Sequence, residues 1–255
     1  MHELVDWLLD APLFRDRSEG GRALAALLPD FGPQTVVVGL ARGGVLVAAE
    51  IAAARGWPLD VLAVRKVGHP YQPEYALGAV TPDRDGVYVR AHDGLTDGQV
   101  AHAVAEARRE ARELDRRLHG EHPPVERTSR TIVLVDDGLA TGATMIAAAR
   151  WAAADASRTV AAIPVAARQS VEQMLDEVDL LFCPHVRDDL YAVGIWYADF
   201  SPVSDDDVLR LLDDAAARSR APNSPSPGGG DEPADVGDRE QPDDIPVPHH
   251  EPAAR

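Results

Sequence analysis

The sequence predicts an α/β protein built on a doubly wound, mostly parallel sheet with an inserted long helix. Residues 35–40, 59–64 and 131–135 are short, mainly apolar runs that do not alternate with polar residues. Strands of this kind are buried on both faces, as in a parallel sheet covered by helices. Segments at helical spacing follow these runs, and ligands bind such sheets at the carboxyl ends of the strands.

The composition indicates one principal domain in a soluble, cytoplasmic protein. The chain has 255 residues, 45% of them hydrophobic, so it can bury a sizeable core. Its formal net charge of −17 argues against nucleic acid or a membrane surface as a general partner, because those polyanions would be repelled. No stretch has the length of a membrane span. The single cysteine, Cys183, cannot form an internal disulfide, which suits a reducing compartment.

Helices are predicted where apolar residues recur at helical intervals. The predicted helices are residues 1–29 (covering helices interrupted by the polar stretch 14–17), 45–55, 96–120, the alanine-rich segment from Thr144 to about 154, 170–175 and 204–212. The helix over 96–120 is the inserted long one, and Thr96 with Gln99 forms its capping box. Further short strands are expected at 77–80 and 86–89, as an antiparallel excursion, and at 159–165 and 180–183.

The domain is predicted to end near residue 220. Residues 1–220 contain all the predicted helices and strands. Residues 221–255 are rich in Pro, Gly, Ser, Asp and Glu and have almost nothing apolar to bury. Such a segment cannot offset the entropy of ordering, so we expect a disordered acidic tail.

The strongest signal for function follows the strand at 131–135. Asp136-Asp137-Gly138-Leu139-Ala140-Thr141-Gly142-Ala143-Thr144 joins this strand to a helix. A turn of small residues exposes successive N–H groups, and the helix N-terminus adds positive potential, which together suit a phosphate monoester. The Thr hydroxyls can donate to the same phosphate, and the adjacent carboxylates can accept bonds from vicinal sugar hydroxyls. An ordinary turn with a capping Asp would explain only part of this set, so we expect a site for a phosphorylated ribose.

Three cations are predicted to converge on the same edge of the sheet. Arg42 stands in the turn Ala41-Arg42-Gly43-Gly44 after the first strand, while Arg65 and Lys66 follow the second and precede a loop. Taken singly, each is as readily explained as a solvated surface residue. Together, beside the phosphate turn, they would attract a second anionic group.

These motifs resemble those of the type I phosphoribosyltransferases. Residues 132–144 are similar to that family's motif for 5-phosphoribosyl 1-pyrophosphate (PRPP), which is an apolar strand, two acidic residues, two variable positions and then small-Thr-Gly-small-Thr. The likeness extends over residues 11–212. It includes 39–44, similar to the family's pyrophosphate loop, and Val64-Arg65-Lys66. In the family this loop often contains a non-proline cis peptide, which here would join Ala41 and Arg42.

The resemblance implies a reaction and its participants. PRPP would be the co-substrate, bound by residues 41–44 and 136–144, and Mg2+ the cofactor, held by Asp136 and Asp137 directly or through water. The catalytic residues would be Arg42, Arg65, Lys66 and Asp137: the cations stabilise leaving pyrophosphate and the carboxylates orient the ribose. A small-molecule nitrogen acceptor would attack C1. The resemblance also implies a homodimer.

Two further segments are assigned by resemblance. Residues 68–78 are similar to the mobile loop that closes over the reaction centre in this family; an ordinary surface loop is the alternative. Residues 191–200 resemble the hood strand of purine enzymes, in which Trp196 or Tyr197 would stack on an acceptor ring. Packing in the core is the alternative for these aromatic residues.

The acceptor and the activity stay open. Ala140 stands where the 6-oxopurine enzymes of the family have an Asp that handles the purine proton. The leading interpretation is a phosphoribosyltransferase of nucleotide metabolism or salvage that acts on a nucleobase or a related nitrogen heterocycle. One alternative is a non-catalytic regulatory protein that keeps the fold and senses PRPP or a nucleotide. Another is phosphorolysis or hydrolysis of a phosphoribosyl compound.

Overall fold

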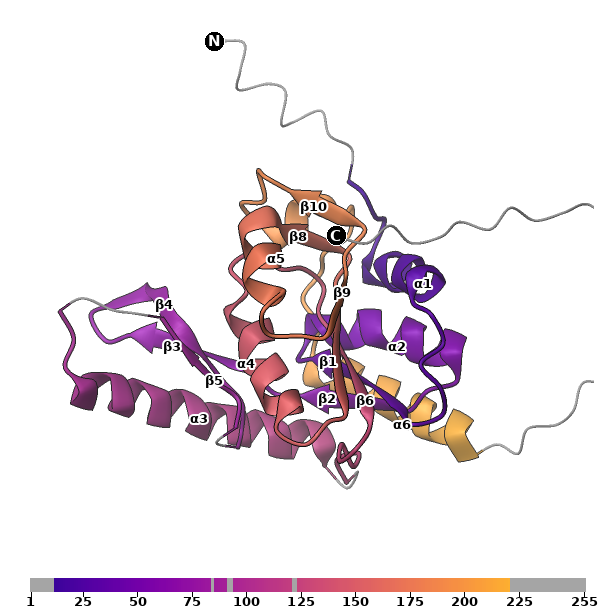
Figure 1. The fold of residues 1–255 in the computed structure, drawn as a ribbon, viewed down its shortest axis with the longest axis horizontal. Helices are drawn as coiled ribbons and strands as arrows, with labels where there is room; N and C mark the ends of the chain where they lie inside the picture. Colours follow the sequence, from indigo (N-terminus) through magenta and orange to yellow (C-terminus); the bar gives the residue numbers. More distant parts are fainter. Residues whose placement is uncertain (1–11, 84, 91–93, 121–122, 221–255) are drawn as a thin grey trace, which may run out of the picture. The chain divides into compact units, whose positions relative to one another are not determined.

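The computed structural model describes residues 12–83, 85–90, 94–120 and 123–220, without the side chains of 73, 74 and 220. Its central sheet has five parallel strands in the order β2-β1-β6-β7-β9 (Figure 1). These strands are β1 (Thr35–Leu40), β2 (Leu59–Leu62), β6 (Thr131–Val135), β7 (Arg158–Ala162) and β9 (Leu180–Phe182). The predicted doubly wound, mostly parallel sheet is confirmed.

The direction in which successive strands are added to the sheet reverses between β1 and β6: β2 lies on one side of β1, whereas β7 lies on the opposite side of β6. β1 pairs with β2 on one side and with β6 on the other, and the register sets Gly39 opposite Val135. The connections from these neighbouring strands lead away in opposite directions, which leaves a crevice at their carboxyl ends. The turns at 41–44 and 136–144 both lie at this crevice.

The strands do not alternate in polarity because each side of the sheet packs on its own apolar cluster. Val37 and Val133 face a cluster formed with α1, α2, α3 and α6, whereas Val36 and Ile132 face a second cluster formed with α4 and α5. The helices are α1 (Arg17–Leu27), α2 (Gly43–Arg55), α3 (Asp97–His119), α4 (Ala143–Ala153), α5 (Arg168–Met174) and α6 (Asp205–Arg220).

A smaller antiparallel sheet confirms the antiparallel excursion predicted at 77–80 and 86–89, but it has a third strand that was not predicted. Its strands are β3 (Arg65–His69), β4 (Gln72–Val80) and β5 (Val87–Val89), in the order β3-β4-β5. The strand predicted over 59–64 ends at Leu62, so Arg65 and Lys66 begin β3 and do not close a strand of the central sheet. Residues 68–78, predicted to be a loop, lie mostly in the β3–β4 hairpin, whose backbone groups pair with each other.

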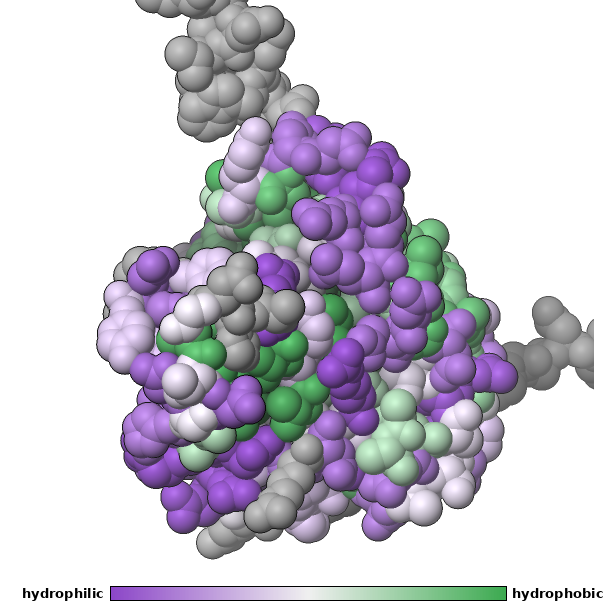
Figure 2. Space-filling model, turned by 60° about the vertical axis from the view of Figure 1, so that its left-hand side comes forward, coloured by the Kyte–Doolittle hydropathy of each residue, from purple (hydrophilic) through white to green (hydrophobic). Residues whose placement is uncertain are grey.

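The long helix α3 links this small sheet to the main core. The Thr96 side chain accepts a bond from the Gln99 N–H at 3.3 Å, which confirms the predicted capping box. Ala107 packs in the apolar cluster of the small sheet, whereas Leu114 and Leu118 pack in the main core. Figure 2 shows the molecule from the side of the small sheet, where apolar residues (green) gather towards the middle of the face and hydrophilic ones (purple) surround them.

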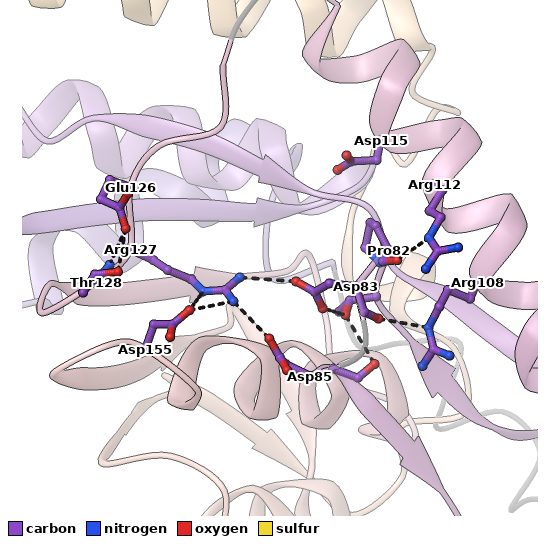
Figure 3. Close-up of polar contacts among 12 residues, drawn as sticks. Pro82, Asp83, Asp85, Arg108, Arg112, Asp115, Glu126, Arg127, Thr128 and Asp155 are labelled. Atoms are coloured by element: carbon purple, nitrogen blue, oxygen red, sulfur yellow. Dashed lines mark hydrogen bonds and ion pairs between the residues drawn. The ribbon is translucent and has the colours of Figure 1, made fainter.

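Arg127 fixes the turn between β4 and β5 to the body of the protein. Its guanidinium pairs with Asp83 at 3.4 Å, Asp85 at 3.2 Å and Asp155 at 2.8 Å (Figure 3). It also stacks on the Trp151 ring of α4, 4.4 Å from the centroid. Because the Arg127 side chain is only 18% exposed, these contacts are partly shielded from solvent. One end of the small sheet is therefore held against α4.

The segments after β7 differ from the predicted succession of strand, helix and strand. The strand expected over 159–165 is divided into β7 and β8 (Val165–Ala167), because Pro164 has no N–H to donate to a ladder. β8 pairs in parallel with β10 (His185–Arg187) in a separate sheet. Residues 191–200, predicted to be a hood strand, contain the 3-10 helix η2 (Val193–Trp196). The backbone that follows η2 pairs with the segment at Phe14, not with another strand of a hood sheet.

The last helix, α6, is longer than predicted. It runs to Arg220 instead of ending at 212, and it buries Val208, Leu212 and Ala215. Ser204 caps it as predicted: its hydroxyl accepts a bond from the Asp207 N–H at 3.1 Å. The apolar positions at 4–8 and the predicted tail at 221–255 lie outside the described residues. Within the described residues, no helix is both long and apolar enough to cross a membrane.

A buried charged network ties α3 to the central sheet. The His119 side chain, 10% exposed, sits 3.1 Å from Asp60 Oδ1 through Nε2 and 3.2 Å from Asp115 Oδ1 through Nδ1. The other oxygen of Asp60 accepts a bond from the Val125 N–H at 2.9 Å. Burial alone would lower the pKa of His119, but the bonds to Asp115 and Asp60 outweigh it and raise the pKa to about 10.

This network predicts a pH dependence of stability. Because the pKa of His119 rises from 6.5 in the unfolded chain to about 10 on folding, its contribution is complete below pH 6.5 and is lost as the pH rises through 10. The free energy of unfolding in urea should fall over this window, and His119→Gln should remove that part of the slope. His102→Gln, which changes an exposed residue of the same helix, is the control. Equal slopes in wild type and His119→Gln would contradict the pairing.

Candidate functional site

The turn at 136–144, which follows β6, points its carbonyl groups outward. Several of its carbonyl oxygens accept hydrogen bonds from groups outside the turn. The bonds are to Asp137 O from Tyr197 Oη (2.6 Å), to Leu139 O from Ala167 N (2.8 Å), to Ala140 O from Ser170 Oγ (2.7 Å), to Thr141 O from Arg90 Nη2 (2.7 Å) and to Gly142 O from Ile146 N (2.9 Å). In a trans peptide the C=O and N–H point in opposite directions, so the N–H groups that follow these carbonyls point inward.

The inward N–H groups form an anion-binding concavity. The N–H groups of Gly138 and of residues 140–144 have no acceptor within the described part of the chain. Gly142 adopts a φ of +77°, which glycine tolerates best, and Gly142 and Ala143 are buried. Buried N–H groups nearly always have partners, and these lie at the positive end of α4. The turn therefore has the geometry to bind an anion such as a phosphate.

The loop at 41–44, after β1, opens onto the same crevice. The peptide bond between Ala41 and Arg42 is cis, as the resemblance implies. The N–H groups of residues 42–44 have no acceptor among the described residues. A Cβ on Gly43 would overlap the Asp137 carboxylate, and a Cβ on Gly44 would overlap the carbonyl oxygen of Val135. Glycine at both positions therefore lets this loop pack directly against the end of β6.

Between the two loops lie the paired carboxylates. Asp136 Oδ1 accepts a bond from the Asp137 N–H at 2.9 Å. Asp137 Oδ2 accepts one from Arg17 Nε at 2.7 Å, and Arg17 also donates to the carbonyl of Ser201 at 2.9 Å and stacks on the Phe200 ring. The side chains of Arg17 and Asp137 are only 9% and 15% exposed. Arg17 thus holds one carboxylate of the pair in a shielded, directional contact.

The two carboxyl groups have unusual titration properties. Burial, reinforced by the charge of Asp137, raises the pKa of Asp136 well above its ordinary value; the hydrogen bond from the Asp137 N–H and the charges of Arg17 and Lys66 oppose this only in part. Burial also raises the pKa of Asp137, against the opposing bond from Arg17. Perturbed groups of this kind in a crevice are typical of functional sites.

The predicted cations lie in two places. Arg42 pairs with Asp205 of α6 at 2.6 Å, and Arg117 of α3 pairs with the same carboxylate at 3.1 Å. Burial, together with the charges of Arg42 and Arg117, lowers the pKa of Arg65. The charge of Lys66 acts instead on Asp136, whose pKa it lowers. The predicted cations therefore act on two groups of residues, Arg42 and Arg65 on the side of the first loop and Lys66 on the side of the carboxylates.

Trp196 and Tyr197 lie in an apolar cluster with Phe14. Each is 4% exposed, the Tyr197 ring packs on Phe200, and the Arg187 guanidinium stacks on Trp196. The Tyr197 hydroxyl donates to the carbonyl of Asp137. In this conformation both rings pack in the core, the alternative considered for them from the sequence, and Tyr197 supports the phosphate turn. A stacking role with an acceptor stays a prediction.

The sequence alone did not single out Arg17, Arg117 or Asp205. Arg17 falls in the polar stretch that interrupts the first helical pattern, and its partner Asp137 is 120 residues away. Asp205 looks like an ordinary acidic residue of a helix N-terminus. The one available signal for Arg117 was its place in the last turn of the inserted helix, which is equally typical of a residue that favours the helix dipole.

Comparison with known proteins identifies the family. The model of the phosphoribosyl transferase domain matches residues 18–188. The chain belongs to this family. Its phosphoribosyltransferase domain is 41% identical over 210 residues to a protein of Mycobacterium tuberculosis (strain H37Rv) that is provisionally named a phosphoribosyl transferase. That match covers 80% of this chain and 47% of the relative, so the chain spans about half the length of the curated relatives it matches.

A solved structure shares the fold of this phosphoribosyltransferase chain. The protein TT1426 from Thermus thermophilus is 39% identical and superposes with a TM-score of 0.66. The match covers 78% of this chain and 97% of the Thermus chain. The common part therefore includes nearly all of a solved protein.

The Arg17 contact predicts opposite effects of neighbouring substitutions on stability. Asp136→Asn should raise the melting temperature at pH 7.5, because the raised pKa of Asp136 means that its ionisation opposes folding; the gain should disappear below about pH 4. Burial raises the pKa of Asp137 as well, so Asp137→Asn also removes a buried carboxylate; it should nevertheless lower stability by about 1–3 kcal/mol, because leaving the buried Arg17 charge without its partner costs more than that relief.

Thermal unfolding followed by circular dichroism measures both effects. Asp176→Asn, which changes an exposed carboxylate, is the matched control and should leave the melting temperature nearly unchanged. A loss of stability in Asp136→Asn equal to that in Asp137→Asn would show that the two carboxylates are not distinguished by Arg17.

Proposed function

We propose that the protein transfers the 5-phosphoribosyl group of PRPP to a nitrogen atom of a nucleobase or related heterocycle and releases pyrophosphate. The observation that supports this most is the pair of loops at 41–44 and 136–144, each with N–H groups that lack acceptors among the described residues. The two loops flank two carboxylates, Asp136 and Asp137. This order of groups matches a ligand with a pyrophosphate at one end, a phosphate monoester at the other and sugar hydroxyls between them.

Each part of the crevice has a role in this proposal. The N–H groups of Gly138 and of residues 140–144 bind the 5-phosphate, and Asp136 with Asp137 accepts bonds from the ribose hydroxyls. The N–H groups of 42–44, with Arg42 and Arg65, bind the pyrophosphate. As the bond from C1 to pyrophosphate breaks, its electron pair leaves with the pyrophosphate and the acceptor nitrogen bonds to C1. The cations stabilise the charge that develops on the leaving group.

The carboxylates of Asp136 and Asp137 suit a magnesium ion only if the substrate supplies most of its ligands. Among the described residues no group of three or more His, Cys, Asp or Glu side chains could hold a metal. Asp137 Oδ2 is already bound to Arg17, which leaves Asp136 as the less committed carboxylate. Mg2+ commonly binds through one or two carboxylates, substrate phosphates and water, and this pair can supply that contact. When bound, the ion would neutralise charge on the pyrophosphate.

The experiment is calorimetric titration of PRPP with magnesium, followed by pyrophosphate release with a panel of nucleobases. We expect wild type to bind PRPP and one base to trigger release. Asp136→Asn should weaken PRPP binding by about 10- to 100-fold, since it loses charge-assisted bonds to the ribose, whereas Asp176→Asn should bind normally. An Asp136→Asn protein that gains stability but loses PRPP would separate a binding role from a structural one.

The outcomes distinguish the candidate functions. Binding with no release for any base would favour a sensor of PRPP over a transferase. Release of pyrophosphate without a base would favour hydrolysis. No binding of PRPP by folded wild type would contradict the proposal as a whole.

A further inference from the structure

Arg90 connects the small antiparallel sheet to the phosphate turn. It directly follows β5, where its backbone N–H donates to the carbonyl of Leu77 in β4 at 2.8 Å. Its guanidinium crosses to the other sheet, and Nη2 donates to the carbonyl oxygen of Thr141 at 2.7 Å. The rest of its guanidinium has no hydrogen-bond acceptor among the described residues. A long cationic side chain is thus ordered against the outer face of the turn.

In the described part of the chain, Arg90 is the one charged group among the outside donors to the carbonyls of this turn. The other contacts come from the hydroxyls of Tyr197 and Ser170 and from backbone N–H groups. The carbonyl of Thr141 and the N–H of Gly142 belong to one peptide unit. A charge-assisted bond to the oxygen polarises that unit and makes its N–H a stronger donor towards the inside of the turn.

The local charge balance favours such a group. The segment 136–144 contains no basic side chain of its own, while Asp136 and Asp137 stand at its start. A phosphate monoester carries nearly two negative charges at neutral pH, so it would be repelled by these carboxylates. Arg17 is committed to Asp137, and Arg42 to Asp205. Among the described residues, Arg90 is the cation that donates to a backbone carbonyl of the turn.

We propose that Arg90 is a positioning residue of the phosphate subsite, acting through the Thr141–Gly142 peptide to favour a phosphate dianion. This inference rests on the proposed function, because it assumes that a 5-phosphate occupies the turn. It adds a residue from the small sheet to a subsite that is otherwise made of one continuous segment.

Arg150 provides a matched comparison. It also joins α4 to the small sheet: Nη1 donates to the carbonyl of Val87 at 3.1 Å, and its guanidinium lies over the Tyr88 ring. It pairs with Glu177 and makes no contact with the turn. Loss of Arg150 therefore weakens the docking of the small sheet without changing the polarisation of the Thr141–Gly142 peptide.

The test is calorimetric titration of ribose 5-phosphate and, separately, of pyrophosphate into wild type, Arg90→Gln, Arg90→Lys and Arg150→Gln. We expect Arg90→Gln to lose about tenfold or more in affinity for ribose 5-phosphate at pH 7.5 and to keep its affinity for pyrophosphate. Arg90→Lys should retain part of the affinity, and Arg150→Gln nearly all of it. Because the second pKa of a phosphate monoester is about 6, the loss in Arg90→Gln should be smaller at pH 5.

Three results would overturn the role of Arg90. They are unchanged affinity for ribose 5-phosphate in Arg90→Gln, an equal loss in Arg150→Gln, and an equal loss for pyrophosphate in Arg90→Gln. Melting temperatures verify that each variant is folded, and Arg90→Lys supplies the comparison if Arg90→Gln is unstable. If folded wild type binds neither ligand, the proposed function fails, and the role of Arg90 fails with it. If wild type and Arg90→Gln instead bind ribose 5-phosphate equally well, only the role of Arg90 fails.

Discussion

The direct packing of the loop at 41–44 against the end of β6 is the constraint on which the site depends. Gly43 and Gly44 leave no room for a Cβ between this loop and the residues Val135 to Asp137. Backbone packing, and not long side chains, therefore fixes the position of the two turns with unpaired N–H groups relative to each other. Because β1 and β6 are neighbours in register, the relation between the turns follows from the sheet itself.

The same close packing has an energetic cost that Arg17 only partly offsets. Two adjacent carboxylates are enclosed at the end of a buried strand, and burial raises the pKa of both. Arg17 binds Asp137, is nearly buried itself, and is held in place by the Ser201 carbonyl and the Phe200 ring. Asp136 accepts a bond from the Asp137 N–H but has no ion-pair partner among the described residues. This arrangement leaves one carboxylate committed to the fold and the other disposed towards a ligand, which is the usual compromise between stability and function.

Features encoded in consecutive residues were predicted correctly, whereas features that depend on partners remote in sequence were missed. The strand at 131–135, the turn after it and the helix after that are encoded in consecutive residues, and the structure reproduces them closely. The strand β3 was missed because Arg65 to His69 has a single buried apolar residue, Val67, and pairs with β4 through its backbone. The hood strand was wrongly predicted because the backbone after η2 bonds to Phe14, about 180 residues earlier in the chain. Arg17 and Asp205 could not be found for the same reason, since each acts on a partner remote in sequence.

The hairpin of the small sheet limits where a closing motion can occur. Its inner part is fixed by ladder pairing, by the Arg127 contacts at the β4–β5 turn and by Ala107 of α3, whose other end is packed in the main core. The pairing becomes irregular on both sides of Gly68, and a Cβ at Gly68 would meet nothing within 4 Å. Beyond this point the tip carries the exposed Tyr71, whose hydroxyl accepts a hydrogen bond from Gln99 Nε2 of α3 at 2.6 Å, so a motion of the tip has to break this bond. The prediction of a mobile loop can therefore apply only to the outer hairpin, because Arg65 and Lys66 lie in the paired part of β3.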